Sequence, residues 1–351
     1  MIIPSDTGRH IEHHNGIAAL SHTRLALPDL ENQSAALLKP IVAGVCRSDL
    51  REIAATRYGR TDFGHEIVAT VAATTPELAD RRGSTVVFDP HPPLAARSSG
   101  FADVVSLCGT PDNVRAALVP APPGVAADVA VFTEPLACAV HCARRASELT
   151  RDPAASIAIF GAGMTGTLIA AALTATGRSC RLTNRSSQRL QFLRHRRALP
   201  ARVLDPDPIG DAATVILATA ALTASDLDTA LSMLAEGGTV ILFSGTTPAQ
   251  EIAGIDVDAV RRHQRHARVT VPGYQPAFFA GSYGATRADF ETAGELLAAP
   301  PTLDGWSPAR CTRRLITQQL GLDDAADHLN AALTHPHFGK TLIWINPAEH
   351  R

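Results

Sequence analysis

Short apolar runs alternate with amphipathic stretches through the middle of the chain. The run "SIAIF" at 156–160 has the length and β-branched content of a buried strand, and the small-residue stretch at 167–177 follows a helical pattern. The same alternation predicts strands at 180–183, 214–218, 239–243 and 268–271, and helices at 187–198 and 226–238. Such alternation is typical of a parallel sheet covered on both faces, so we expect this domain at 151–281.

The N-terminal part has a different pattern. Runs such as "AALLKPIVAGV" and "HEIVATVAA" are strand-like, and Pro and Gly interrupt the stretches between them. This pattern predicts an antiparallel β domain rather than a second parallel unit.

Composition narrows the class of protein. The chain has 351 residues, 45% hydrophobic and 19% charged, with a net charge of −2, which suits a globular protein of about two domains. Scattered Lys and Arg predict no nucleic-acid or membrane-surface partner. The start "MIIPSDTGRH" lacks a basic-then-apolar signal pattern, and the six cysteines form no disulfide-like framework, so we expect a cytoplasmic protein with reduced thiols.

A glycine-rich segment, "GAGMTG", lies between the first strand and the first helix of the predicted parallel domain. Gly161 permits a tight turn, Gly163 allows close approach of a pyrophosphate, and Gly166 allows the helix to pack against the strand. The helix start, with Met164 and Thr165, presents unpaired N–H groups to an anion. The context favours a dinucleotide site, the alternative being a tight turn in another α/β unit.

The end of the second predicted strand indicates which dinucleotide is bound. NAD-binding units carry an acidic residue about 20 residues after the glycine turn, to bind the ribose 2′-hydroxyl. Here Asn184 holds that position, followed by Arg185, Ser186 and Arg189. These donors suit a 2′-phosphate, so we favour NADP(H) over NAD(H). The alternative is that the arginines belong to a solvated helix start.

Three segments of the N-terminal part carry groups that bind metals. They are "GVCRSDL", "GHE" and "TEPLACAVH", which contain Cys46, His65, Glu66 and Glu134. A thiolate, an imidazole and a carboxylate together suit zinc, and widely separated ligands are typical of catalytic rather than structural zinc sites.

These segments and the glycine turn, in this order, resemble the zinc-dependent medium-chain dehydrogenase/reductase family. The segments at 281–298 and 338–345 resemble the family's C-terminal part. The resemblance implies a GroES-like β-rich catalytic domain, built from 1–150 and 282–351, with a Rossmann domain inserted at 151–281. It also implies an active site between the two domains and a dimer or tetramer, of which we expect a homodimer.

The resemblance implies roles for individual residues. Cys46 and His65 match zinc ligands. Glu66 matches a carboxylate that polyol-type members use as a ligand or exchange ligand. Glu134 matches a glutamate that holds zinc directly or through water, and the choice between the two carboxylates stays open. Asp49 matches the residue that fixes the ligating imidazole, as carboxylates near metal-bound histidines do.

Two further residues complete the implied mechanism. Ser48 matches the hydroxyl that bonds the substrate oxygen and carries its proton. Arg47 matches a position where some members contact the cofactor pyrophosphate, the alternative being a solvated charge. Zinc would polarise an alcohol or carbonyl oxygen while the nicotinamide exchanges hydride with the carbon.

Three departures from the family pattern limit these inferences. Arg51 stands where many members place a proton-relaying histidine, and arginine releases no proton near neutral pH. Residues 89–109 contain only Cys108, so we expect one catalytic zinc and no four-cysteine structural zinc. The interval from Cys46 to His65 is short for the family, which makes substrate inference from relatives unsafe.

The sequence therefore predicts an NADP(H)-preferring, zinc-dependent dehydrogenase of a small-molecule secondary alcohol, with a polyol, sugar or cyclitol as candidate substrates. One alternative is a medium-chain reductase of a C=C or C=N bond with little or no zinc chemistry. A second alternative is a non-catalytic NADP(H)-binding protein.

Overall fold

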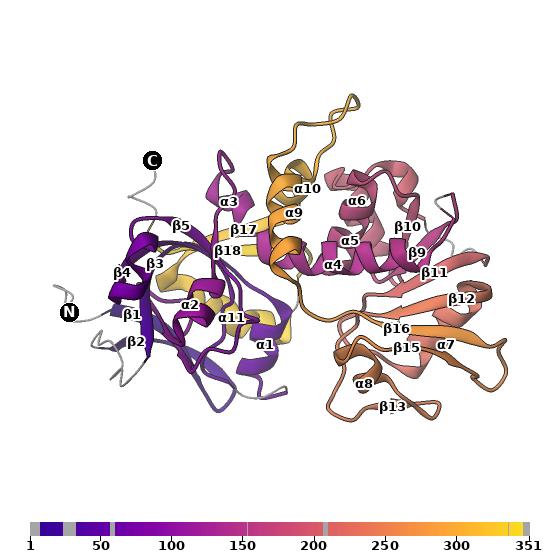
Figure 1. The fold of residues 1–351 in the computed structure, drawn as a ribbon, viewed down its shortest axis with the longest axis horizontal. Helices are drawn as coiled ribbons and strands as arrows, with labels where there is room; N and C mark the ends of the chain where they lie inside the picture. Colours follow the sequence, from indigo (N-terminus) through magenta and orange to yellow (C-terminus); the bar gives the residue numbers. More distant parts are fainter. Residues whose placement is uncertain are drawn as a thin grey trace. The chain divides into compact units, whose positions relative to one another are not determined.

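A computed structural model describes residues 8–23, 33–56, 60–152, 154–205, 210–335 and 337–346. The chain divides into two compact units (Figure 1). The first comprises Met1–Glu134 and Ile316–Arg351, and the second comprises Pro135–Leu315. Most of the N-terminal stretch used to predict localisation, residues 1–7, lies outside the described residues.

The first unit is built on an eight-stranded sheet with the order β17-β18-β3-β4-β5-β8, in which β7 pairs with β3 and β6. Its strands are β3 (Ser34–Gly44), β4 (Glu66–Thr74), β5 (Thr85–Phe88), β6 (Ala96–Arg97), β7 (Val105–Gly109), β8 (Leu118–Pro120), β17 (Ile316–Gly321) and β18 (Lys340–Trp344). All its pairs are antiparallel except β17 with β18. The predicted antiparallel β domain is therefore present, and β3 and β4 cover the two runs quoted from the sequence except for Val45 and His65.

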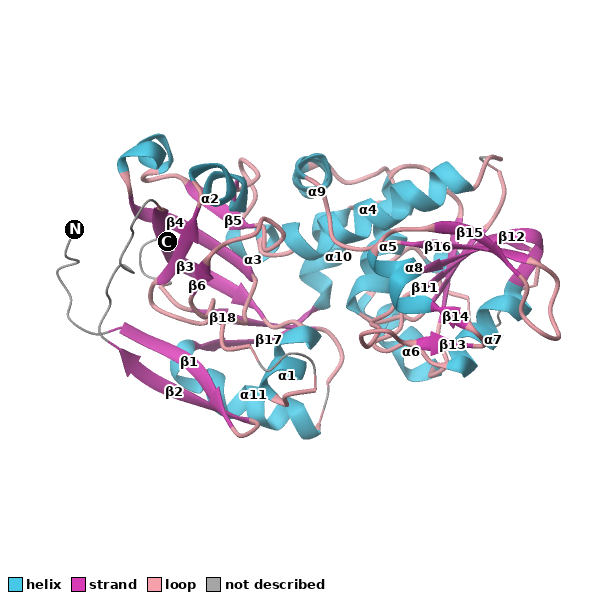
Figure 2. Cartoon of the chain, turned by 60° about the horizontal axis from the view of Figure 1, so that its bottom comes forward, coloured by secondary structure: helices cyan, strands magenta, loops and turns pink. Residues whose placement is uncertain are grey.

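A hairpin and several short helices complete the first unit. They are β1 (Gly8–His14), β2 (Ile17–Thr23), α1 (Arg47–Ile53), η1 (Pro76–Arg81), α2 (Pro111–Ala117), α3 (Ala127–Ala130), η3 (Leu322–Asp324) and α11 (Ala325–Thr334). Figure 2 shows the hairpin beside α11, where the Ala18 amide donates to the Asn330 side chain at 2.8 Å. The core packs Phe88 and Phe101 with aliphatic side chains from the strands and from α11. The two ends of the chain thus share one core.

The second unit is built on a six-stranded sheet with the order β10-β9-β11-β12-β16-β15. Its strands are β9 (Ile157–Phe160), β10 (Cys180–Thr183), β11 (Ala212–Leu217), β12 (Leu234–Leu242), β15 (His266–Val269) and β16 (Ala277–Gly281), with a small β13–β14 hairpin (Glu251–Ile252 and Ile255–Asp256) beside it. The predicted parallel sheet is confirmed for all these strands except β15, which runs antiparallel to β16.

The strand predicted at 268–271 is present as β15, but it begins and ends two residues earlier, at His266–Val269. A further strand, β16, follows it, which the sequence pattern did not predict. The connection from β15 to β16 contains no helix. Since a parallel crossover needs a dozen or more residues, this short link forces the antiparallel direction.

Helices flank the sheet of the second unit. They are α4 (Thr133–Leu149, which begins in the first unit), α5 (Met164–Ala175), α6 (Ser187–Arg196), η2 (Ala201–Val203), α7 (Ala224–Met233), α8 (Val257–Arg262), α9 (Arg287–Ala298) and α10 (Pro308–Leu315). Figure 1 shows α5 and α6 on one side of the sheet, and α7 and α8 on the other. None of the helices within the described ranges combines the length and apolar character needed to cross a bilayer.

The helix predicted at 226–238 is displaced in the structure. It begins at Ala224, because Thr223 and Asp226 form a capping box at its start, and it ends at Met233. Residues from Leu234 onward are extended and belong to β12, where Leu234 pairs with Ala212. The two glycines of this segment therefore lie inside a strand and do not end the helix.

The compact units differ in extent from the predicted domains. Their boundaries fall after Glu134 and after Leu315, whereas the motifs placed boundaries near 150 and 281. Helix α10 packs against α5 and α9, which groups the segment up to Leu315 with the Rossmann-type sheet.

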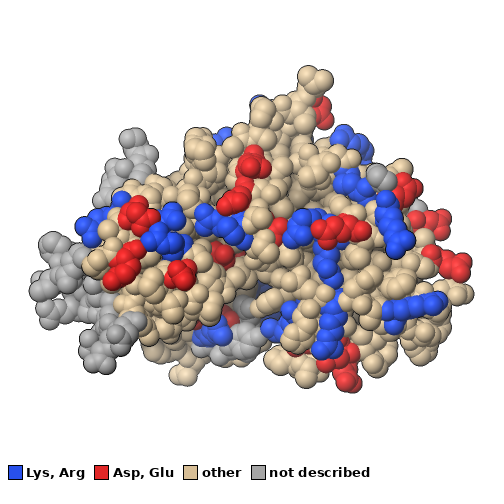
Figure 3. Space-filling view, viewed as in Figure 1, with Lys and Arg blue, Asp and Glu red and all other residues tan. Residues whose placement is uncertain are grey.

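Figure 3 shows positive and negative side chains interspersed over the visible face.

Candidate metal and cofactor sites

The start of α1 and the loop before β4 are tied together by one carboxylate. Asp49 Oδ2 accepts from the backbone N–H of Cys46, which caps α1, at 2.8 Å. Its Oδ1 accepts from the N–H of Gly64 at 2.9 Å, and the residue is 1% exposed. Because Gly64 immediately precedes His65, this bridge brings Cys46 and His65 to the same place.

A cluster of potential metal ligands results. The ligand atoms of Cys46, His65 and Glu66 all lie within 4.8 Å of one another. His65 Nδ1 lies 3.5 Å from Asp49 Oδ1, and His65 Nε2 lies 3.9 Å from Glu134 Oε2. The structure thus brings together the four residues proposed as ligands and the carboxylate proposed to orient the imidazole.

A buried lysine holds one of the candidate ligands. Lys340 Nζ lies 2.5 Å from Glu66 Oε2 and donates to the Val45 carbonyl at 3.1 Å, and the Lys340 and Glu66 side chains are 3% and 2% exposed. A Cβ on Gly44 would lie 2.6 Å from the same Glu66 oxygen. Lys340 is not among the residues proposed from the sequence, although a lysine at the start of the apolar segment "KTLIW" is a signal of burial with a partner.

The pKa values of the cluster residues reflect the negative charge of the carboxylates around them. Burial lowers the pKa of His65, but Asp49, Cys46 and Glu134 outweigh it and raise this pKa well above its usual value. Burial raises the pKa of Glu134, and the charge of Glu66 adds to this effect, while His65 opposes it. A thiol, an imidazole and two buried carboxylates fit a divalent cation, which would offset the cost of burying this much negative charge.

The hydroxyl proposed to bind substrate is unpaired. Ser48 Oγ is buried and makes no hydrogen bond to any residue that the structure describes. A buried polar group left in this state costs about 1–3 kcal/mol, so such groups mark places where a ligand supplies the missing bond. Arg47 is exposed as the first residue of α1, and Arg51 lies in its last turn.

A second histidine, which the sequence analysis missed, lies near the same glutamate. His91 Nδ1 lies 2.7 Å from Asp89 Oδ1, and the His91 backbone N–H donates to the same oxygen at 2.9 Å. A ring nitrogen of His91 and a carboxylate oxygen of Glu134 lie within 4.8 Å of each other. The only local signal is "DPH", an aspartate two residues before a histidine, directly after β5.

The glycine turn of the second unit has the geometry argued from its sequence. Gly161 has φ +121°, and a Cβ there would lie 2.6 Å from the Ala218 carbonyl oxygen. A Cβ on Gly166 would lie 1.8 Å from the Gly161 carbonyl oxygen, whereas one on Gly163 would meet nothing within 4 Å. The first and third glycines are thus required by packing, and the second leaves an open approach to the start of α5 at Met164 and Thr165.

The residues proposed to select the cofactor are already bonded. Asn184 Oδ1 accepts from the Ala162 N–H at 2.8 Å, and Asn184 Nδ2 donates to the Ser186 carbonyl at 3.0 Å. Arg185 Nη2 donates to Asp226 Oδ1 at 2.5 Å. The start of α7 thus places a carboxylate beside Arg185, from a position distant in the sequence. Arg189 lies in the first turn of α6, which Ser186 precedes.

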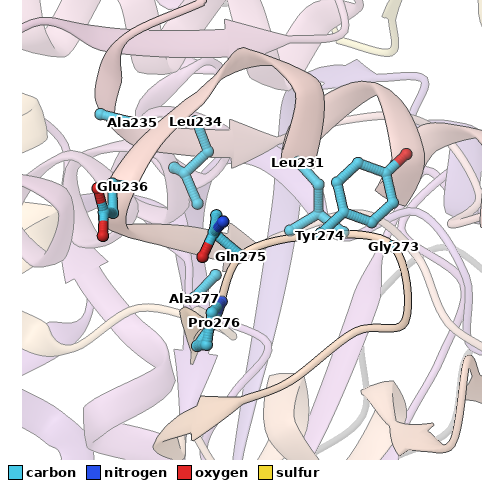
Figure 4. A pocket seen from close by; sticks show the side chains of 9 residues that line it. All are labelled: Leu231, Leu234, Ala235, Glu236, Gly273, Tyr274, Gln275, Pro276 and Ala277. Atoms are coloured by element: carbon cyan, nitrogen blue, oxygen red, sulfur yellow. The ribbon is translucent and has the colours of Figure 1, made fainter.

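A cavity of about 450 Å³ lies elsewhere in the second unit. Figure 4 shows Leu231, Leu234, Tyr274 and Gln275 among its lining residues, at the starts of β12 and β16. Ligands of doubly wound sheets bind at the carboxyl ends of the parallel strands. This cavity is at the amino ends and is separate from the glycine turn.

Comparisons with known proteins establish the fold. No protein-family model and no curated protein matches the chain. Among solved structures, an Escherichia coli CFT073 alcohol dehydrogenase in complex with NADH has a TM-score of 0.71 and 16% identity, covering 97% of this chain and 100% of that one. The 2R,3R-butanediol dehydrogenase of Bacillus subtilis has a TM-score of 0.68 and 19% identity, covering 96% of this chain and 99% of that one.

A third similar structure is Staphylococcus aureus TarJ in complex with NADPH, with a TM-score of 0.68 and 14% identity, covering 97% of this chain and 99% of that one. The chain therefore has the fold of medium-chain alcohol and polyol dehydrogenases, and the predicted GroES-like β-rich domain with an inserted Rossmann domain is confirmed as its fold class. Because one neighbour holds NADH and another NADPH, the fold does not select between these cofactors.

Proposed function

We propose that the protein is a zinc-dependent oxidoreductase that transfers hydride between NADP(H) and a secondary alcohol or ketone. The observation that carries this proposal is the cluster of Cys46, His65 and Glu66, together with the buried, unpaired hydroxyl of Ser48, two residues after Cys46 in the chain. Soft and hard ligands together suit zinc, and an unpaired hydroxyl suits a substrate oxygen.

Cys46, His65 and a carboxylate from Glu66 or Glu134 would hold the zinc. When bound, zinc supplies Lewis-acid polarisation of an alcohol or carbonyl oxygen. Asp49 fixes the imidazole of His65, and Ser48 bonds the substrate oxygen and carries its proton. We expect one zinc per chain and no structural zinc. Cys108 is buried, and its thiol donates to Gln33 Oε1 at 2.7 Å.

The second unit would bind the dinucleotide. The open approach at Gly163 and the N–H groups at the start of α5 suit a pyrophosphate. Arg185, Ser186 and Arg189 are donors for a 2′-phosphate, which supports NADP(H), and Arg47 is a further candidate for the pyrophosphate. Nη2 of Arg185 donates to Asp226, and a guanidinium has five N–H donors, so the pair is compatible with a bound phosphate.

The proposal also covers the substrate class and the oligomeric state. A polyol, sugar or cyclitol suits the thiolate, imidazole and carboxylate set, and the butanediol dehydrogenase of similar fold acts on a diol by its name. We expect a homodimer, which sedimentation analysis of the purified protein tests directly.

One observation favours a second candidate function. Arg51 stands where the family's proton-relaying histidine is expected, and a reductase of a C=C or C=N bond has no alcohol proton to pass on. Such an enzyme would use the same hydride geometry with little or no zinc chemistry.

The deciding experiment measures metal and activity together. Protein purified without chelator is analysed for zinc, then assayed with NADPH and NADH against alcohols, ketones, enones and imines before and after chelation. We expect one zinc per chain and ketone reduction that chelation abolishes. Enone or imine reduction that survives chelation would establish the second candidate, and cofactor binding without turnover would establish a non-catalytic protein.

A further inference from the structure

Two histidines, each facing an aspartate, lie close to the carboxylate of Glu134. His65 lies 3.5 Å from Asp49 and 3.9 Å from Glu134. His91 lies 2.7 Å from Asp89 and within 4.8 Å of Glu134. All five residues belong to the first unit. The carboxylate of Glu134 is thus within reach of two imidazoles that are oriented in the same manner.

Asp89 holds the His91 side chain in an orientation suited to metal binding. Asp89 is 6% exposed, and its Oδ1 contacts both the ring Nδ1 and the backbone N–H of His91. A proton on Nδ1 shared with this carboxylate leaves the lone pair of Nε2 available to a metal. Metal-ligating histidines almost always donate their other ring N–H to a carboxylate, a carbonyl or water, which fixes the ring.

The neighbouring carboxylate ligands are not equivalent. Glu66 shares one oxygen with the buried ammonium of Lys340, which reduces the negative charge that it offers to a cation. Lys340 acts on Glu134 through its charge as well. Glu134 Oε2 lies 3.9 Å from His65 Nε2, and a Glu134 carboxylate oxygen lies within 4.8 Å of a ring nitrogen of His91. A cation bound beside Glu134 would therefore have the imidazole of His91 close to it.

We propose that His91, held by Asp89, is a further ligand of the divalent metal at this centre and enters on the side of Glu134. This inference rests on the proposed zinc site and adds a residue to it. Two imidazoles with the Cys46 thiolate select borderline transition ions such as Zn²⁺ and Co²⁺ over Mg²⁺ and Ca²⁺. Catalytic zinc sites sometimes expand to five ligands, so a position for a substrate oxygen would remain.

Metal affinity tests the proposal without reference to turnover. Zn²⁺ dissociation constants are measured by competition with a chromophoric chelator for the wild type, His91→Asn, Asp89→Asn and the control His328→Asn. His328 belongs to the same unit, and its ring Nε2 lies 3.0 Å from the Thr341 hydroxyl. We expect Zn²⁺ affinity to fall at least about 10-fold in His91→Asn and about 10-fold in Asp89→Asn, and to stay unchanged in the control.

Cobalt substitution gives a second readout. In His91→Asn, the ligand-field bands of bound Co²⁺ should shift, while the thiolate charge-transfer band from Cys46 should remain. Melting of the metal-free proteins identifies a variant that fails to fold, and His91→Gln then replaces it. Unchanged Zn²⁺ affinity and an unchanged Co²⁺ spectrum in folded His91 variants would overturn the proposal while leaving the zinc site intact. A wild type that binds no Zn²⁺ would instead overturn the proposed function.

Discussion

The glycine turn of the second unit and the charged centre of the first are built in opposite ways. The turn uses six consecutive residues, and its geometry depends on missing side chains, since a Cβ on Gly161 or Gly166 would overlap backbone atoms. The centre uses side chains from residues as distant as Glu66 and Lys340, each bonded to a group from another segment. A site made of backbone atoms can therefore be predicted from a short sequence motif. A site made of charged side chains depends on partners that the fold brings close from distant segments.

The largest expected effect comes from removing the thiolate. Cys46→Ala deletes the soft ligand of the cluster, so we expect loss of bound zinc and loss of all ketone reduction. Elemental analysis and a reduction assay measure the two quantities. Cys108→Ser is the matched control, because it keeps a donor for Gln33 outside the cluster. A Cys46→Ala protein that retains zinc would show that the cluster is not the metal site.

Ser48→Ala tests the unpaired hydroxyl. Proton-transfer groups contribute about 10²–10⁴-fold to rate, so turnover should fall by this factor while zinc content and NADPH affinity stay near wild type. Arg51→His, on the same helix, should be tolerated. Turnover of the three proteins against pH on one accepted alcohol is the measurement. Undiminished turnover in Ser48→Ala would favour the C=C or C=N reductase.

Arg185→Ala tests whether the arginine beside Asp226 binds the 2′-phosphate of NADP(H). Loss of a charge-assisted bond costs about 1.5–3 kcal/mol, so NADPH binding should weaken roughly 10- to 150-fold while NADH binding stays unchanged. Adding Asn184→Asp, which keeps the acceptor for the Ala162 N–H, should shift preference further toward NADH. Fluorescence titration measures both affinities. A wild type that binds NADH as tightly as NADPH would contradict the assignment.

The glycine turn is tested by two alanine substitutions with opposite expectations. Gly166→Ala places a Cβ against the Gly161 carbonyl, so overpacking should destabilise the fold by about 1–3 kcal/mol. Gly163→Ala meets open space, so stability should be retained while NADPH affinity falls about 10-fold or more, which is about 1.4 kcal/mol. Urea unfolding and NADPH titration separate the two effects. Equal NADPH affinity in Gly163→Ala and wild type would argue against a pyrophosphate at this turn.

A His–Asp pair in the second unit sharpens the comparison, because it lies outside the metal cluster. His141 Nδ1 contacts Asp289 Oδ2 at 2.8 Å, with Gln264 on its other nitrogen and Arg144 beside it. The Asp289 hydrogen bond raises the pKa of His141 against the effect of burial. Burial raises the pKa of Asp289, but bonds from His141 and Thr286 outweigh it and leave this pKa lowered.

The signs of these shifts set the pH window. The stabilisation from His141 is complete below its ordinary pKa of 6.5 and is lost as the pH rises through the raised pKa. That from Asp289 is present above its ordinary pKa of 3.8 and is lost as the pH falls toward the lowered pKa. We expect His141→Asn to lower the free energy of unfolding by about 1–3 kcal/mol at pH 6 and by less at pH 9, measured by urea unfolding. An equal decrease at the two pH values would show that the pair contributes through packing and not through charge.

The sequence by itself determined the features that depend on neighbouring residues. The turn at Gly161 and the strands of the parallel sheet follow from local pattern, since backbone conformation is set within a few residues. The helix predicted to continue past Met233 was wrong because a strand pairing with Ala212 outweighed helical propensity.

The tertiary structure alone decided the partners of the charges. Lys340 reaches Glu66 because β18 pairs antiparallel with β3, which places Leu342 opposite Gly44. Arg185 meets Asp226 because β10 and β11 lie on either side of β9 in the sheet. Sheet pairing depends on long-range burial, which a sequence motif does not encode, so the groups that tune the two sites come from elements far away in the chain.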